Sequence, residues 1–170
     1  DDLAALYRGG YLHDIGKVGV PDVVLLKEGP LSQIERNVMR VHPLVGDRLC
    51  SRLRSLQRVR PIIRHHHERL DGSGYPDGLA GDAIPLVTQV ISIVDIYDAL
   101  TTSRPYRKAL GPDDASVELI KEADERWLNR NLVEEFTAMV REQRLPSIDG
   151  EAERRARFLR TRHDPSGDGS

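Results

Sequence analysis

The chain has 170 residues, 39% apolar and 31% charged, a composition that fits one soluble domain with a substantial core. Its formal net charge of −2 gives no general positive field of the kind that marks a nucleic-acid binder. The single cysteine, Cys50, excludes an internal disulfide framework and a cysteine zinc finger. No apolar run approaches the roughly 18 residues of a membrane span, and the first residues of this chain do not resemble a secretory signal. We therefore expect a cytoplasmic protein that neither spans a membrane nor binds nucleic acid.

Hydrophobic periodicity predicts helices nearly throughout the chain and no convincing alternating strand. Ser32 followed by Glu35 is typical of a capping box at a helix N-terminus. Apolar residues then recur at helical steps, as one apolar face: Ile34, Val38, Val41 and Val45. Pro43 interrupts this run, so we expect one helix to end near His42 and another to begin with Pro43 in its first turn.

Further helices are predicted over residues 60–70, from Pro85, from Pro112 and around residues 132–140. The helix from Pro85 is predicted to bury one stripe of side chains: Leu86, Val90, Ile93, Val94, Tyr97 and Leu100.

Residues 71–82 are rich in glycine and contain a Gly-Ser-Gly-Tyr-Pro string, which predicts a loop. A loop of this length inside a compact domain is usually functional or disordered. We assign residues 1–145 to one domain, and we expect the polar residues 146–170 to form a disordered tail.

Four short stretches concentrate the side chains that bind metals, namely His13-Asp14, His42, His66-His67 and Asp95. Imidazole nitrogens and carboxylate oxygens without a thiolate suit Fe, Mn, Co, Ni or Zn in a catalytic centre better than a closed structural zinc site. A carboxylate such as Asp14 can bridge two ions about 3.5–4 Å apart, an arrangement that activates a water against a phosphoester.

Simpler explanations exist for some of these residues. Asp95 stands among apolar residues, and a buried carboxylate needs a strong partner, for which a metal or an arginine would serve. His65 and His163 are interpreted as ordinary surface or core histidines. Residues 47–69 hold seven arginines against two acidic residues. That excess indicates either a solvated helix face or a surface that steers an anionic dinucleotide.

The order of these motifs resembles the HD-GYP family, a branch of the HD phosphohydrolase superfamily. The resemblance runs from Leu12 to Phe136 and rests on four strings: His13-Asp14-Ile15-Gly16-Lys17, His66-His67-Glu68, Asp71-Gly72-Ser73-Gly74-Tyr75-Pro76, and Asp95-Ile96-Tyr97-Asp98 followed by Arg104-Pro105-Tyr106-Arg107. It implies an all-α, HD-type helical bundle with a long glycine-rich Gly-Tyr-Pro loop. Family members usually carry a preceding pair of helices, so the resemblance also implies that the domain is N-terminally incomplete here.

The resemblance implies the following ligand set for two or three divalent metal ions, with Fe or Mn expected: His13, Asp14, His42, His66, His67 and Asp95. Asp14, as the bridging ligand, and Lys17 are the implied catalytic residues. The implied substrate contacts are Lys17, Asp98, Arg104 and Arg107, since lysine and arginine suit phosphates.

The expected function is a metal-dependent phosphodiesterase that hydrolyses cyclic di-GMP to pGpG or GMP in bacterial second-messenger signalling. An alternative from another class is a non-catalytic cyclic di-GMP sensor, or a docking module for diguanylate cyclase (GGDEF) domains bound through the Gly-Tyr-Pro loop. An HD hydrolase of nucleoside phosphates is a third possibility, against which that loop argues. The resemblance also leads us to expect an upstream receiver or sensor domain, and an apolar surface uncovered beside His13, Asp14 and the helix from Pro85.

Overall fold

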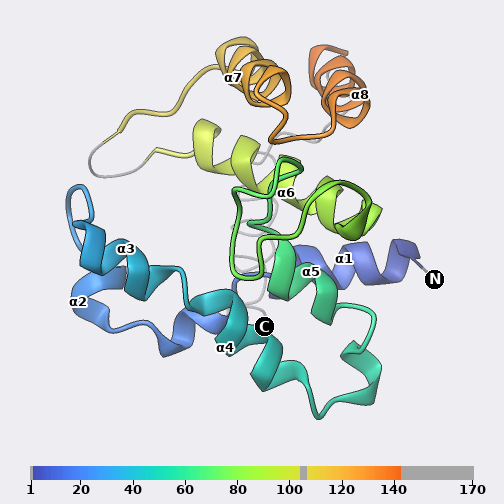
Figure 1. The fold of residues 1–170 in the computed structure, drawn as a ribbon. Coiled ribbons are helices and arrows are strands. Elements are labelled where there is room, and N and C mark those ends of the chain that lie inside the picture. The colour runs from blue at the N-terminus through green and yellow to red at the C-terminus, as the bar shows by residue number, and fades with distance from the viewer. Residues whose placement is uncertain (1, 104–106, 143–170) are drawn as a thin grey trace, which may run out of the picture.

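The computed structural model describes residues 2–103 and 107–142, which form helices joined by turns and loops (Figure 1). The helices are α1 (Asp2–Leu12), α2 (Asp22–Leu25), α3 (Gln33–Met39), α4 (His42–Cys50), α5 (Arg60–His65), α6 (Leu86–Thr101), α7 (Pro112–Asp124) and α8 (Arg130–Arg141). Short 3-10 helices are η1 (Ile15–Gly19), η2 (Arg54–Leu56) and η3 (Gly81–Ala83). An isolated bridge joins Asp71 to Ala80, and the described ranges hold no strand. The all-α fold class is confirmed, while the predicted tail 146–170 lies outside the described residues.

Helix α6 crosses the middle of the molecule and packs against helices on two sides (Figure 1). On one side Ile93 joins Leu119 of α7 and Val133 of α8 in a buried cluster. On the other side Ile91 packs with Ala5 of α1 and Ile62 of α5. Burial of these side chains stabilises the fold by roughly 1.5–3 kcal/mol for each large one. Helix α6 therefore holds the two halves of the domain together.

Helix α4 is fixed by close backbone contact with η1. A Cβ atom on Gly16 would lie 1.9 Å from the carbonyl oxygen of His42, so no larger residue fits there. Gly46 is enclosed from the same side, since its Cβ would approach the backbone nitrogen of Gly16 to 3.2 Å. The segment that follows Asp14 therefore rests directly on the helix that begins with His42.

The capping box is confirmed at α3. Ser32 accepts a hydrogen bond from the backbone N–H of Glu35, and the Glu35 carboxylate accepts one from the backbone N–H of Ser32. The predicted apolar face contributes little to the core, because Ile34 is 78% exposed and α3 buries no residue. The helix ends at Met39, before the predicted end near His42, whereas Pro43 does stand in the first turn of α4.

The predicted stripe on α6 is wrong in part. Leu86 is 62% exposed and Val94 is also exposed, while Thr88 and Ser92 are buried beside Ile91 and Ile93. The physical reason is that α6 lies between two groups of helices, so it buries two faces instead of one. Helix α5 also stops at His65, five residues before the predicted end, because the chain turns there into the 71–82 loop.

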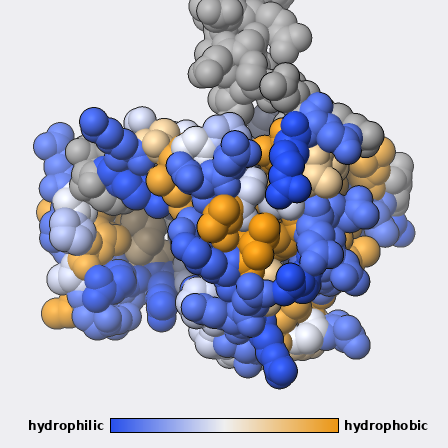
Figure 2. Space-filling model, turned by 90° about the horizontal axis from the view of Figure 1, so that it is seen from above, coloured by the Kyte–Doolittle hydropathy of each residue, from blue (hydrophilic) through white to orange (hydrophobic). Residues whose placement is uncertain are grey.

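Apolar side chains remain exposed on several elements. On α1, Leu3, Tyr7 and Tyr11 are each about two-thirds exposed or more, with the two tyrosine rings in edge-to-face contact. Figure 2 looks down on the molecule of Figure 1 and shows hydrophilic side chains over much of that face, with apolar residues in small groups. That upstream helices cover part of the domain stays a prediction. In the ranges that the structure describes, no helix has the length and apolar character needed to cross a membrane.

Candidate metal centre

The six predicted ligands come together from four parts of the fold, each near a helix end or on the central helix. His13 and Asp14 lie between α1 and η1, His42 opens α4, His66 and His67 follow α5, and Asp95 lies on α6. They form two groups, each with ligand atoms within 4.8 Å of one another: His42, His66 and His67, and His13, Asp14 and Asp95. Residues separated by as many as 82 positions (95 − 13) are thus brought to one place.

Three of the histidines are oriented by backbone carbonyl groups. The Nδ1 atom of His13 lies 2.9 Å from the Gly10 oxygen, and that of His42 lies 2.9 Å from the Met39 oxygen. The Nδ1 atom of His66 lies 3.0 Å from the Ile63 oxygen. Because a carbonyl oxygen only accepts, each Nδ1 must carry the hydrogen and donate it. Each Nε2 is then left with a free lone pair, as in metal sites whose ligands are oriented by outer partners.

The Nε2 atoms converge at a separation that a metal ion fits. Those of His42 and His66 lie 3.3 Å apart, although both rings are almost wholly buried. Two nitrogens bound to one ion at about 2.0–2.1 Å are about 3.0–3.4 Å apart at ordinary coordination angles. Two lone pairs facing each other in a buried place would otherwise be unfavourable, so the donor set fits a divalent cation.

Asp14 lies between the two groups. Its Oδ1 is 3.3 Å from Nε2 of His42 and 3.9 Å from Nε2 of His66, while its Oδ2 is 3.5 Å from Nε2 of His13. Burial opposes its ionisation, but the contacts with His42 and Lys17 outweigh burial and hold the pKa of this carboxyl far below its usual range. A carboxylate that offers one oxygen to each group has the geometry of a bridging ligand.

Asp95 completes the second group. Its Oδ1 lies 3.5 Å from Nε2 of His13, which is its ion-pair partner among the described residues; the alternative, an arginine partner, is not found there. Burial acts to raise the pKa of Asp95, yet the contact with His13 makes the net shift downward. Burial also acts to lower the pKa of His13, and Asp95 and Asp14 reverse that shift. In the metal-free protein each of these two side chains therefore favours the ionised form of the other.

His67 is held by an aromatic contact. Its ring stacks on Tyr75 with centroids 4.8 Å apart and an interplanar angle of 27°. The guanidinium of Arg40 lies over the Tyr75 ring, 4.9 Å from its centroid. Burial and the neighbouring imidazoles lower the pKa of His67 well below its usual value, so it stays neutral and able to bind a metal. Arg40 is a residue that the sequence motifs do not indicate, since the contact exists only in the folded chain.

Of the predicted substrate contacts, Lys17 alone reaches the ligand groups in the described part of the chain. Its Nζ lies 2.5 Å from Oδ2 of Asp14. Asp98 is exposed near the end of α6, and the Arg107 side chain is exposed and donates a hydrogen bond to the carbonyl oxygen of Ala99. Arg104 lies outside the described residues.

Comparison with known proteins now identifies the family. Residues 2–132 match the family model described as HD domain. The chain belongs to the HD domain family. The resemblance to its HD-GYP branch, inferred from the strings around His13, His66 and Tyr75, is confirmed by the family match and by the relatives described next.

Two curated relatives and one solved structure illustrate the similarity. The chain is 50% identical over 117 residues to the cyclic di-GMP phosphodiesterase response regulator RpfG of Xanthomonas campestris pv. campestris, covering 68% of this chain and 31% of RpfG. It is 39% identical over 121 residues to the 3'3'-cGAMP-specific phosphodiesterase 3 of Vibrio cholerae, covering 71% of this chain and 26% of that protein. The HDGYP protein Bd1817 of Bdellovibrio bacteriovorus has the same fold, with a TM-score of 0.64 at 21% identity over 81% of this chain and 43% of Bd1817. The chain thus spans less than a third of either curated relative.

Proposed function

We propose that this chain is the catalytic domain of a metal-dependent phosphodiesterase that hydrolyses cyclic di-GMP to pGpG or GMP. The observation that carries the proposal is the set of Nδ1-anchored imidazoles whose Nε2 atoms converge beside Asp14. The names of the relatives support a cyclic dinucleotide as the substrate class.

In this proposal His42, His66 and His67 hold one divalent ion, His13 and Asp95 hold a second, and Asp14 bridges them. The mixed nitrogen and oxygen donors suit Fe or Mn. When bound, such a pair of ions lowers the pKa of a water and stabilises the charge that develops on the phosphoryl oxygens. The carbonyl contacts of His13, His42 and His66 keep each ring in the tautomer that can bind, so the chain supplies a preorganised ligand set.

We assign Lys17 to binding the phosphate of the substrate. Its ammonium lies at Oδ2 of Asp14, where it is placed to neutralise a non-bridging phosphate oxygen of the dinucleotide. Arg107, Asp98 and Arg104 follow the last ligand, Asp95, in the sequence, and we assign them to the second phosphate and the guanine edges. The guanidinium fork suits a phosphate, and a carboxylate suits the N–H groups of guanine.

We further propose that the domain works downstream of a receiver or sensor domain in the cytoplasm. RpfG is named a response regulator, and the single cysteine of this chain is a buried free thiol, as is common in a reducing compartment. Docking of GGDEF domains through the Gly-Tyr-Pro loop remains a prediction.

The test uses the full-length protein, loaded in turn with Fe(II) and Mn(II), with metal content measured before each assay. Cyclic di-GMP and 3'3'-cGAMP are offered separately, and the products are separated by chromatography. We expect pGpG or GMP from cyclic di-GMP, and no product from the Asp14→Asn variant. Metal-loaded protein that binds cyclic di-GMP without cleaving it would instead establish the sensor function.

A further inference from the structure

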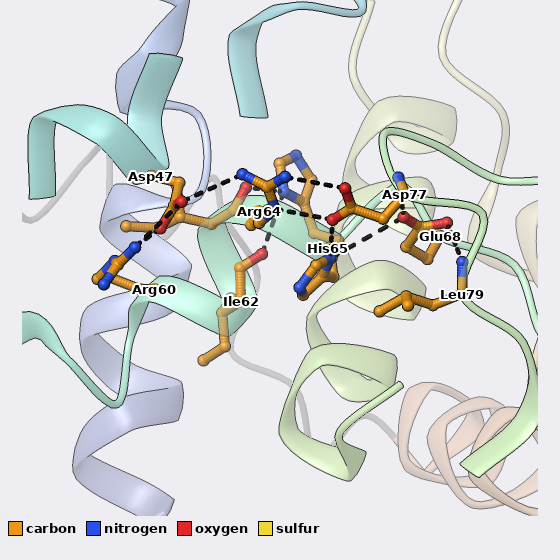
Figure 3. Close-up of polar contacts among 10 residues, drawn as sticks. Asp47, Arg60, Ile62, Arg64, His65, Glu68, Asp77 and Leu79 are labelled. Carbon is orange, nitrogen blue, oxygen red and sulfur yellow. Dashed lines mark hydrogen bonds and ion pairs between the residues drawn. The ribbon is translucent and has the colours of Figure 1, made fainter. Parts of the chain in front are cut away.

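A polar network connects α4, α5 and the 71–82 loop (Figure 3). Arg64 of α5 lies between Asp47 of α4 and Asp77 of the 71–82 loop. Its Nε and Nη2 atoms donate to the two carboxylate oxygens of Asp77 at 2.7 and 2.8 Å, and its Nη1 donates to Asp47 at 3.2 Å. Such a bidentate pair fixes orientation as well as distance. None of these three side chains belongs to the two ligand groups of the metal centre.

A second contact holds the same loop to the same helix end. The side chain of Glu68 is wholly buried, and its two carboxylate oxygens accept hydrogen bonds from the backbone N–H groups of Asp77 and Leu79 at 2.7 and 3.1 Å. The loop backbone runs so close that a Cβ on Gly74 would lie 2.4 Å from the Cα of Glu68. Breaking these contacts would leave a buried carboxylate without partners, which is strongly unfavourable.

The loop carries this restraint to the ligand groups. The backbone N–H of Tyr75 donates to the carbonyl oxygen of His67 at 3.2 Å, and the Tyr75 ring stacks on the His67 ring. Asp77, two residues after Tyr75, accepts two hydrogen bonds from Arg64. The same arginine contacts Asp47 on α4, the helix that begins with His42. The network thus connects the elements that present His42 and His67.

A third metal site in this place is excluded by its own contacts. His65, Glu68 and Asp77 have ligand atoms within 4.8 Å of one another. However, both oxygens of Glu68 accept backbone hydrogen bonds and both oxygens of Asp77 accept from Arg64, whose positive charge would repel a cation. The carboxylate oxygens of Glu68 and Asp77 instead accept the hydrogen bonds that hold the 71–82 loop in place.

We infer that Arg64 is a positioning residue for the metal centre: by holding Asp77 and Asp47 together, it keeps the loop, Tyr75 and His67 in the geometry that binds metal. The inference rests on the proposed metal-dependent function, since it names a residue that supports the same site. Arg60 offers a matched control, because it donates to Asp47 at 2.7 Å but has no contact with the loop in the described residues. Its side chain is 32% exposed, as is that of Arg64.

The experiment compares the full-length wild type with Arg64→Ala, Asp77→Asn, their double variant, Arg64→Lys and Arg60→Ala. Mn(II) affinity is measured by titration of the metal-free proteins, and hydrogen exchange is followed over residues 71–82. Loss of an outer partner of a metal ligand typically costs about 10- to 100-fold in affinity, and we expect about 10-fold for Arg64→Ala and for Asp77→Asn. The double variant should lose no more than the singles, because both remove one contact. Arg64→Lys should recover only part of the affinity, since lysine lacks the fork.

We expect faster hydrogen exchange of residues 71–82 in Arg64→Ala and Asp77→Asn. In these two variants kcat should fall by a larger factor than KM changes. Arg60→Ala should stay within about twofold of wild type in Mn(II) affinity and in hydrogen exchange. Equal Mn(II) affinity and equal loop exchange in Arg64→Ala and wild type would overturn the inference, as would equal losses in Arg60→Ala. If Arg64→Ala does not fold, the Asp77→Asn variant decides the matter, because the Asp77 side chain is partly exposed in the loop. A wild type that binds no metal overturns the proposed function itself, whereas a wild type that binds metal as tightly as Arg64→Ala overturns only this inference.

Discussion

The Nε2 atoms of His42 and His66 face each other at 3.3 Å across 24 positions of sequence. Each ring is turned this way because its Nδ1–H donates to a carbonyl three residues earlier, that of Met39 for His42 and that of Ile63 for His66. The orientation is therefore set by the backbone before any metal arrives. A preorganised donor pair of this kind lowers the cost of ordering side chains when the ion binds.

Asp14 is expected to be the most sensitive position. Asp14→Ala removes the carboxylate that lies between His42 and His13, so both ions of the proposed centre would lose a shared ligand. Metal content should fall, and hydrolysis should drop below detection. Elemental analysis and a turnover assay measure the two effects, with Asp22→Ala, in the exposed part of α2, as the control. Full metal occupancy and activity in Asp14→Ala would show that the assignment is wrong.

The histidine triplet offers a matched pair of substitutions. His66→Gln should weaken metal binding by at least about 100-fold, because it removes a buried nitrogen donor. His65→Gln should leave metal content nearly unchanged, since the ring of His65 faces Asp77 and Glu68 instead of the ligand groups. Titration with Mn(II) compares the two. Loss of metal binding in His65→Gln but not in His66→Gln would mean that the wrong histidines of the triplet were assigned as ligands.

Arg107 is expected to act on the substrate and not on the metal, since its side chain donates to the carbonyl oxygen of Ala99 and not to a ligand side chain. A charge-assisted hydrogen bond contributes roughly 1.5–3 kcal/mol, so Arg107→Ala should lower kcat/KM on the order of 10- to 100-fold. Metal content should remain at the wild-type level. Metal loss in this variant would indicate a structural role for the side chain.

The metal-free protein should become less stable as the pH falls below about 6.5. Burial and the charges of His13 and His42 lower the pKa of His66 to about 4. An unfolded histidine has a pKa of about 6.5, so between these values the unfolded chain binds a proton that the native ring excludes. The stabilising effect of a neutral His66 is thus complete above pH 6.5 and is lost progressively toward pH 4.

The raised pKa of His13 acts in the opposite direction: its contribution is present below pH 6.5 and is lost as the pH rises through the native value. Urea unfolding of the wild type and of His66→Gln at several pH values separates the two groups. We expect a steeper loss of stability between pH 6.5 and 4 in the wild type. Identical slopes would contradict the assignment of this shift to His66.

Candidate ligands could be chosen from the sequence because most of their motifs are short and local. His13-Asp14 and His66-His67 are adjacent pairs, and the capping box at Ser32 and Glu35 involves one helical turn. Such features depend on chain geometry that neighbouring residues determine by themselves. The same holds for the 71–82 loop, whose glycines and proline exclude a regular helix.

Burial patterns and distant contacts could not be predicted in the same way. The stripe on α6 failed because a helix between two layers buries two faces, and Ile34 is exposed on α3, a helix that buries none of its residues. Likewise, nothing local places Arg40 over Tyr75 or Arg64 between Asp47 and Asp77. These contacts arise only when segments that are far apart in sequence pack together.

Because its ligands come from four segments between His13 and Asp95, an ion in this centre would cross-link most of the domain. Metal binding and folding would then be thermodynamically linked. Free metal at 100 times its dissociation constant stabilises the native state by about 2.7 kcal/mol. Such a gain is a substantial part of the roughly 5–15 kcal/mol that holds an ordinary domain folded. The amount of intact protein in a cell would therefore follow the supply of the metal, and starvation for that metal would reduce its abundance as well as its turnover.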